Sequence, residues 1–175
     1  MITIRQACIE DAPGIAKVHV DSWRTTYKGI VPDDYLANLS YLHRTTVWND
    51  ILRDTEKKYI VYVAENEAHE LVGFVAGGPD REENPPYVAE LYSIYILQAY
   101  QGQGIGRQLV RVFAGQLLRV GMKSMLLWVF AQNPARRFYE ALGGRYVKTA
   151  LYEAGDVTIE EVAYGWEDIS VLAQD

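Results

Sequence analysis

A chain of 175 residues with 49% hydrophobic and 23% charged residues has the size and balance of one ordinary globular domain, which we place at residues 1–175. Its net charge of −6 argues against nucleic acid as the main partner, because binding to phosphates needs a basic surface. It contains neither a stretch of 18 apolar residues nor an amino-terminal targeting pattern, so we expect a cytoplasmic protein without a membrane segment.

The first half of the chain predicts a strand, two helices and a hairpin. Residues 3–8 alternate between apolar and polar, as in a half-buried strand, and this predicts a buried structural thiol for Cys8, the one cysteine. A helix is expected to begin at Asp11, a candidate N-cap, with Pro13 in its first turn, and to end before Gly29. A second helix and two paired strands follow at 36–52, 59–64 and 71–76.

The second half alternates strands and helices. A long loop with three prolines is expected at 77–86. After it we expect, in order, a strand, a helix, a strand, a short helix and a final hairpin, at 87–97, 105–120, 124–130, 133–142, 146–152 and 157–166. The strand–helix–strand crossovers imply that the centre of the sheet is partly parallel.

Three glycines lie where the strand at 87–97 passes into the helix that begins at Ile105. The segment reads Gln101-Gly102-Gln103-Gly104-Ile105-Gly106-Arg107. A helix start leaves its first N–H groups unpaired and partly positive, and glycine lets a ligand approach the backbone closely. The turn therefore predicts a pyrophosphate-binding site made by these seven residues.

Spacing rules out two familiar pyrophosphate motifs. The dinucleotide fingerprint needs a glycine where Arg107 stands, and no acidic residue closes the following strand. A P-loop needs Lys-Ser/Thr after its last glycine, whereas Arg107 and Gln108 follow Gly106. What remains is the pattern Gln-x-x-Gly-x-Gly, formed by Gln101, Gly104 and Gly106.

This pattern, between an apolar strand and a long helix, resembles the acyl-CoA signature of the GNAT superfamily of N-acetyltransferases. The expected order of elements is similar over nearly the whole chain. The resemblance implies an α/β (α+β) GNAT fold, with a mixed, mostly antiparallel central sheet, a V-shaped splay between strands 4 and 5, and about four flanking helices. It also implies acetyl-CoA as co-substrate, bound beside strand 4 through the backbone at Ile94 and Ile96, where a main-chain N–H would stabilise the oxyanion.

The resemblance also points to a catalytic acid. The stretch from Asn133 to Gly143 is similar to the family's Asn-x-x-Ala/Arg-x-x-Phe-Tyr-x-x-x-Gly, which implies that Tyr139 protonates the departing thiolate and that Asn133 and Arg136 contact acetyl-CoA. A phenol with a pKa of about 10 can protonate a thiolate whose conjugate acid has a pKa of about 8.5. The alternatives are ring packing for Tyr139, one of 13 tyrosines, and helix capping for Asn133.

Glu90 matches the position of a base used in part of the family. It would take a proton from the amine directly or through water. The alternatives are a solvated strand residue, a carboxylate that orients the substrate, and deprotonation by water without a dedicated base. The histidines and the cysteine show no metal-ligand spacing, so we expect no metal.

The segment 23–35 resembles the acceptor wall in a bacterial subgroup of the family that includes some polyamine acetyltransferases. Trp23 and Tyr27 are the candidate substrate-binding residues, because aromatic faces near carboxylates suit an ammonium group. Alternatively, Trp23 packs in the core while Asp33 and Asp34 cap the second helix.

We therefore expect an N-acetyltransferase that moves an acetyl group from acetyl-CoA directly to a primary amine. The acceptor would be a small molecule such as a polyamine or an amino-acid-like amine. Two alternatives stay open, namely acetylation of protein N-termini or lysines, and an acyl-CoA-binding sensor without turnover. The expected partners are acetyl-CoA and the amine, with no nucleic acid and no membrane, and a homodimer is left open.

Overall fold

The computed structural model describes residues 1–54, 56 and 59–174. In this part of the chain the strands form a seven-stranded sheet in the order β1-β2-β3-β4-β5-β7-β6. The strands are β1 (Thr3–Gln6), β2 (Ile60–Glu65), β3 (Leu71–Pro79), β4 (Ala89–Ile96), β5 (Met125–Phe130), β6 (Arg145–Ala154) and β7 (Val157–Trp166). The α-helices are α1 (Ala12–Thr26), α2 (Asp33–Ala37), α3 (Tyr41–Leu52), α4 (Ile105–Arg119) and α5 (Arg136–Ala141).

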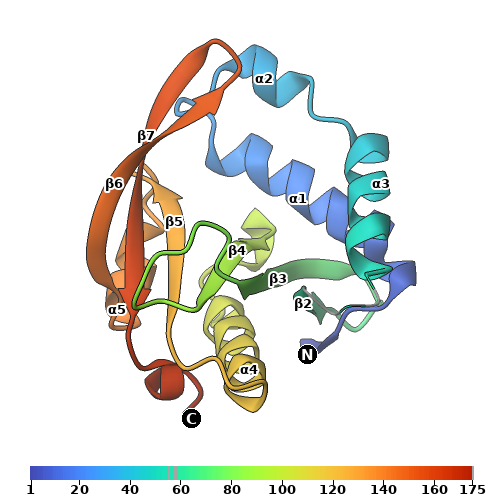
Figure 1. The fold of residues 1–175 in the computed structure, drawn as a ribbon. Coiled ribbons are helices and arrows are strands. Elements are labelled where there is room, and N and C mark those ends of the chain that lie inside the picture. The colour runs from blue at the N-terminus through green and yellow to red at the C-terminus, as the bar shows by residue number, and fades with distance from the viewer. Residues whose placement is uncertain (55, 57–58, 175) are drawn as a thin grey trace.

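Helices cover both faces of the sheet (Figure 1). On one face, α4 contributes four buried side chains at helical spacing, Ile105, Leu109, Phe113 and Leu117. Burying side chains of this size contributes about 1.5 to 3 kcal/mol each, so this stripe fixes the position of α4 and of its amino end. On the other face, α1 and α3 pack against β2 and β3, where the Trp48 and Phe74 rings meet edge to face.

The central strands β4 and β5 separate part way along their length. They run parallel and pair only over three rungs, from Ala89 with Met125 to Leu91 with Leu127, while the other neighbouring strands are antiparallel. This confirms the expected mixed, mostly antiparallel sheet. Beyond Leu91, β4 continues to Ile96 without a rung to β5, so a V opens at the carboxyl ends of the pair.

A bulge in β4 lies at the start of this V. The register of β3 on β4 shifts between Ala76 and Gly77, so that Tyr92 is the extra residue. Glycine is required at position 77, because a Cβ there would collide with the Glu90 carbonyl and the Phe113 ring. A bulge bends the strand that carries it, and this one lies where the pairing of β4 with β5 stops.

Several element boundaries differ from the expectation. The helix expected over 36–52 is two helices, because Ser40 starts α3 by accepting a hydrogen bond from the His43 N–H. The strand β3 extends to Pro79, so the loop begins three residues later than expected. The short helix α5 begins at Arg136, because the Asn133 side chain accepts from the Ala135 N–H and holds a turn before it.

The prediction of a buried thiol at Cys8 is wrong. β1 ends at Gln6, so Cys8 lies beyond the alternating strand and is exposed. Its backbone N–H donates to Asp11, whose carboxylate also forms a bidentate pair with Arg5. The hydrogen bond with Arg5 lowers the pKa of Asp11 to about 2, so this carboxylate fastens the turn between β1 and α1.

The described residues show neither a membrane-spanning helix nor a metal-binding cluster. None of the helices in the described part of the chain is long and apolar enough to cross a membrane. The described residues also do not bring three or more His, Cys, Asp or Glu side chains together in a way that could hold a metal ion.

Candidate active site

The V between β4 and β5 opens into a groove of about 680 Å³. Its walls come from the end of α1, from β4 and β5, from the glycine turn before α4, and from α5. Ile94 and Ile96 line it, and none of the described strands pairs with this part of β4 on the β5 side. The backbone of β4 is therefore available there to an extended ligand that lies alongside it, as an added strand would.

The glycine turn presents unpaired N–H groups to the mouth of the groove. Gly102 and Gly104 have φ angles of +73° and +79°, a left-handed conformation that favours glycine. Within the described residues, no acceptor pairs with the N–H groups of residues 102–107. A Cβ at Gly104 would meet nothing within 4 Å, so open space lies in front of this turn. Unpaired N–H groups at a helix start, with open space before them, make an anion site.

The two glutamines of the motif shape the turn. The Gln101 side-chain amide donates to the Ile96 carbonyl at 3.0 Å, and the Gln103 amide donates to the Ala99 carbonyl at 3.2 Å. Ile105 lines the groove and is buried at the start of α4. Both hydrogen bonds close the loop between β4 and α4, so the glutamines hold the N–H groups in place through the backbone.

Gly106 serves close packing as well. A Cβ there would lie 3.1 Å from the Phe138 ring and 3.3 Å from Ile96, a tight contact. The missing side chain of Gly106 thus makes room for α5 and β4, whereas Gly102 and Gly104 face open space. The N–H of Gly106 stays part of the unpaired set.

Tyr139 and Asn133 line the groove from the α5 side, and Arg136 does not. Tyr139 is 8% exposed, and burial raises its pKa well above the usual range. Asn133 is buried, and its side-chain oxygen accepts from the Ala135 N–H at 2.9 Å. The Arg136 guanidinium donates instead to the Tyr164 hydroxyl and the Ala131 carbonyl, each at 3.0 Å.

Glu90 is buried and paired with Arg81. Its carboxylate accepts from Arg81 Nε at 3.0 Å and from Arg81 Nη2 at 2.5 Å, and it is not among the residues that line the groove. The hydrogen bond with Glu90 raises the pKa of Arg81, whose guanidinium lies 4.2 Å from the centre of the Tyr92 ring. The expected direct contact between this carboxylate and a ligand in the groove is therefore absent from the described geometry.

Of the two residues expected to bind the acceptor amine, one lines the groove and the other packs in the core. Tyr27 lines the groove, whereas Trp23 is not among its lining residues and packs edge to face on Tyr27 and Phe130. The Trp23 indole donates to the Tyr95 hydroxyl at 2.9 Å, and that hydroxyl lies 3.3 Å from the Tyr27 hydroxyl. Sequence reasoning missed Tyr95, although strand alternation places it opposite the Ile94 face of β4.

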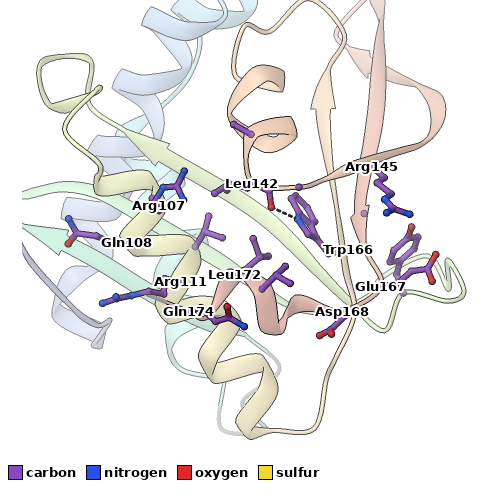
Figure 2. A pocket seen from close by; sticks show the side chains of 16 residues that line it. Arg107, Gln108, Arg111, Leu142, Arg145, Trp166, Glu167, Asp168, Leu172 and Gln174 are labelled. Atoms are coloured by element: carbon purple, nitrogen blue, oxygen red, sulfur yellow. Dashed lines mark hydrogen bonds between the residues drawn. The ribbon is translucent and has the colours of Figure 1, made fainter.

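A second pocket of about 930 Å³ begins at Arg107, which lines both cavities (Figure 2). Arg107 and Arg111 come from one face of α4, and Arg145 comes from the start of β6. Opposite α4, the Trp166 indole donates to the Leu142 carbonyl at 2.9 Å and forms an apolar wall. The sequence gives one signal of this pocket, the spacing of four between the α4 arginines, which puts them on one helix face.

A splayed sheet whose groove ends at a helix start with unpaired N–H groups is suited to an extended, phosphate-bearing ligand. Comparison with known proteins identifies the class. The model of the Acetyltransferase (GNAT) family matches residues 19–144. An uncharacterized N-acetyltransferase of Bacillus subtilis, YuaI, is 43% identical over 98% of this chain and 96% of its own length.

Two further similarities extend this result. The L-methionine sulfoximine/L-methionine sulfone acetyltransferase of Salmonella typhimurium is 30% identical over 62% of this chain and 70% of its own length. The crystal structure of the PaiA N-acetyltransferase from Thermoplasma acidophilum, in complex with coenzyme A, has a TM-score of 0.74 at 22% identity and covers 92% of this chain and 98% of that one. The chain belongs to the GNAT family of acetyltransferases, and acetyl-CoA is its co-substrate.

Proposed function

We propose that the protein transfers the acetyl group of acetyl-CoA directly to a primary amine of a small molecule. The observation that carries this proposal is that one groove contains both Tyr139 and the turn whose N–H groups, at residues 102–107, are unpaired. The relative named for L-methionine sulfoximine supports an amino-acid-like acceptor. A polyamine is the second candidate, since Tyr27 offers an aromatic face to an ammonium group.

Acetyl-CoA would lie along the whole groove. Its pyrophosphate would accept from the N–H groups of residues 102–107, and Arg107 would add charge. Its pantetheine arm would follow β4 past Ile94 and Ile96, with Asn133 on the opposite wall. Arg136 would act by holding α5 in position, because its guanidinium is engaged by Tyr164 and Ala131.

The chemistry then needs one attack and two proton movements. The free amine attacks the thioester carbon, the carbonyl electron pair moves to oxygen, and a proton leaves the nitrogen. Collapse of this tetrahedral species breaks the carbon–sulfur bond, and Tyr139 supplies the proton that the sulfur takes. Burial raises the pKa of Tyr139, but a thiolate in the same apolar groove is destabilised as well, so the two groups stay matched.

Glu90 would receive the amine proton through water, because Arg81 occupies its carboxylate and the groove does not reach it. We expect Glu90→Gln to lower turnover by roughly 100-fold at neutral pH and to recover partly at alkaline pH, where more of the amine is already free base. The measurement is the pH profile of kcat with a true acceptor.

Arg81→Gln is the control for this experiment, since it breaks the same ion pair and keeps the carboxylate. It should lose less activity than Glu90→Gln at neutral pH, because the carboxylate is still present. An equal loss in both variants at every pH would mean that the pair only holds the loop before β4.

The nucleotide end of acetyl-CoA would continue from Arg107 into the second pocket, between α4 and the wall formed by Trp166 (Figure 2). We expect Arg107→Gln to weaken acetyl-CoA binding by roughly tenfold and to make binding less sensitive to salt, because a charge pair with phosphate is screened by ions. Calorimetry at two salt concentrations measures both effects. Arg119→Gln, the same change at the far end of α4, should alter neither.

A thiol-release assay with acetyl-CoA tests the proposal as a whole. The panel contains amino acids and their sulfoximines, polyamines, aminoglycosides and peptides. Turnover on a small amine supports the proposal, and turnover on peptides alone would favour acetylation of protein N-termini or lysines. Tight acetyl-CoA binding without turnover on any acceptor would favour a sensor. A cytoplasmic location and a homodimer stay predictions.

A further inference from the structure

Three side chains on the α1 side of the groove form a directed hydrogen-bond chain. The Trp23 indole N–H can only donate, and it donates to the Tyr95 hydroxyl at 2.9 Å. That hydroxyl lies 3.3 Å from the Tyr27 hydroxyl, so the two phenols share one hydrogen bond. These three side chains have three donor hydrogens and make two hydrogen bonds with one another, so one phenol O–H has no partner among them.

The phenol O–H that has no partner among these three side chains can meet an acceptor in the groove. Tyr27 and Tyr95 both line the groove, and Tyr27 is otherwise buried, with 7% of its surface exposed. Burial of the hydroxyl without any acceptor would cost about 1 to 3 kcal/mol, so an acceptor in the groove is the favourable partner.

Several contacts indicate that Tyr27 provides this O–H. Burial raises the pKa of Tyr27 to about 12, and hydrogen bonds with Tyr95 and Asn133 offset part of this rise. The hydrogen bond with Asn133 lowers the pKa of Tyr27, as an N–H that donates to the phenol oxygen does, and the Asn133 side-chain oxygen is engaged by the Ala135 N–H. Burial also raises the pKa of Tyr95, and the bond with Tyr27 raises it further. These directions fit a Tyr95 hydroxyl that donates to Tyr27.

We propose that Tyr27 donates its O–H to the carbonyl oxygen of the bound thioester and stabilises the oxyanion together with the main-chain N–H expected from β4, with Tyr95 and Trp23 as positioning residues. This inference rests on the proposed acetyl transfer. An amine nucleophile needs its lone pair free, so a donor aimed at nitrogen would suppress attack. The carbonyl oxygen gains charge as the carbon–nitrogen bond forms, and a donor placed there becomes stronger in the transition state.

The position of Tyr27 relative to Tyr139 supports this choice. The charge of an ionised Tyr139 raises the pKa of Tyr27, so the two hydroxyls lie within electrostatic range of each other. Tyr139 is the proposed proton source for sulfur, and the carbonyl oxygen is attached to the carbon that sulfur leaves. Two phenols would thus serve two neighbouring atoms of one thioester.

The test is the carbonyl stretch of acetyl-CoA carrying a ¹³C-labelled acetyl carbonyl, measured by difference infrared spectroscopy on the bound complex. A hydrogen bond to the carbonyl oxygen lowers the stretching frequency relative to free acetyl-CoA. We expect Tyr27→Phe to shift the bound band back to higher wavenumber and to lower kcat by roughly 100- to 1000-fold, with little change in the KM for acetyl-CoA. Trp23→Phe should shift the band less, because it loosens the donor without removing it.

Two further variants serve as controls for the assignment of Tyr27 as the donor. Tyr152→Phe removes a phenol from the same aromatic cluster outside the groove, and it should keep the wild-type band. Tyr95→Phe should keep part of the shift, since Tyr27 still carries its O–H. Full loss in Tyr95→Phe with a wild-type band in Tyr27→Phe would overturn the assignment to Tyr27. An unchanged band in both variants would overturn the inference while leaving acetyl transfer intact, whereas failure of the wild type to bind acetyl-CoA would overturn the proposed function itself.

Discussion

Replacing Tyr139 by phenylalanine should lower kcat by roughly 10²- to 10⁴-fold, or about 3 to 5 kcal/mol of barrier, and leave acetyl-CoA affinity nearly unchanged. The proposed role of the phenol is to protonate the departing thiolate. That interaction strengthens only in the transition state, so its loss falls on kcat. Steady-state kinetics with the best acceptor and calorimetry with acetyl-CoA measure the two quantities separately.

Folding should tolerate this change. Burial and the charge of Tyr95 raise the pKa of Tyr139 and no hydrogen bond within the described residues is among the causes, so removal of the hydroxyl should break no hydrogen bond there. The ring stays and keeps its edge-to-face contact with Phe138, whose centre lies 5.4 Å away, so the melting temperature should hardly move. Wild-type kcat in a folded variant would remove Tyr139 from the mechanism. A loss of acetyl-CoA affinity would instead make the hydroxyl a binding contact.

Local patterns in the sequence predicted much of the fold and the anion site. The stripe of apolar residues along α4, the alternation in the strands and the glycines before Ile105 act within a few neighbouring residues, so each can be recognised without tertiary structure. The splay between β4 and β5 was different. It came only from the family resemblance, because it depends on where the rungs between two distant segments stop.

Contacts between distant segments explain what the sequence could not predict. Arg81 reaches Glu90 because the loop before β4 folds back on its own strand, and this turned the expected base into a paired carboxylate. Trp23 donates to Tyr95, which lies 72 positions later in the sequence. Trp23, which could be read as a core residue, is therefore the first donor in a series of hydrogen bonds that ends at the groove. Neither pairing follows from spacing or from residue type.

The prediction with the most closely matched control concerns Gly104 in the glycine turn before α4. Gly104→Ala should weaken acetyl-CoA binding by roughly 10- to 100-fold, the equivalent of one lost hydrogen bond to a charged group. The new methyl group would stand in the open space before the helix start, where we expect a phosphate oxygen to bind. It would also strain the backbone, because φ at Gly104 is +79°.

Gly121→Ala separates these two effects. Gly121 follows the far end of α4, has a φ of +87°, and a Cβ there also meets nothing within 4 Å. Both variants should lose about 1 to 2 kcal/mol of stability from backbone strain, and their melting temperatures should fall together. Only Gly104→Ala should lose acetyl-CoA affinity by calorimetry. Because the strain is matched, equal affinities in the two variants would show that the turn before α4 does not bind the pyrophosphate.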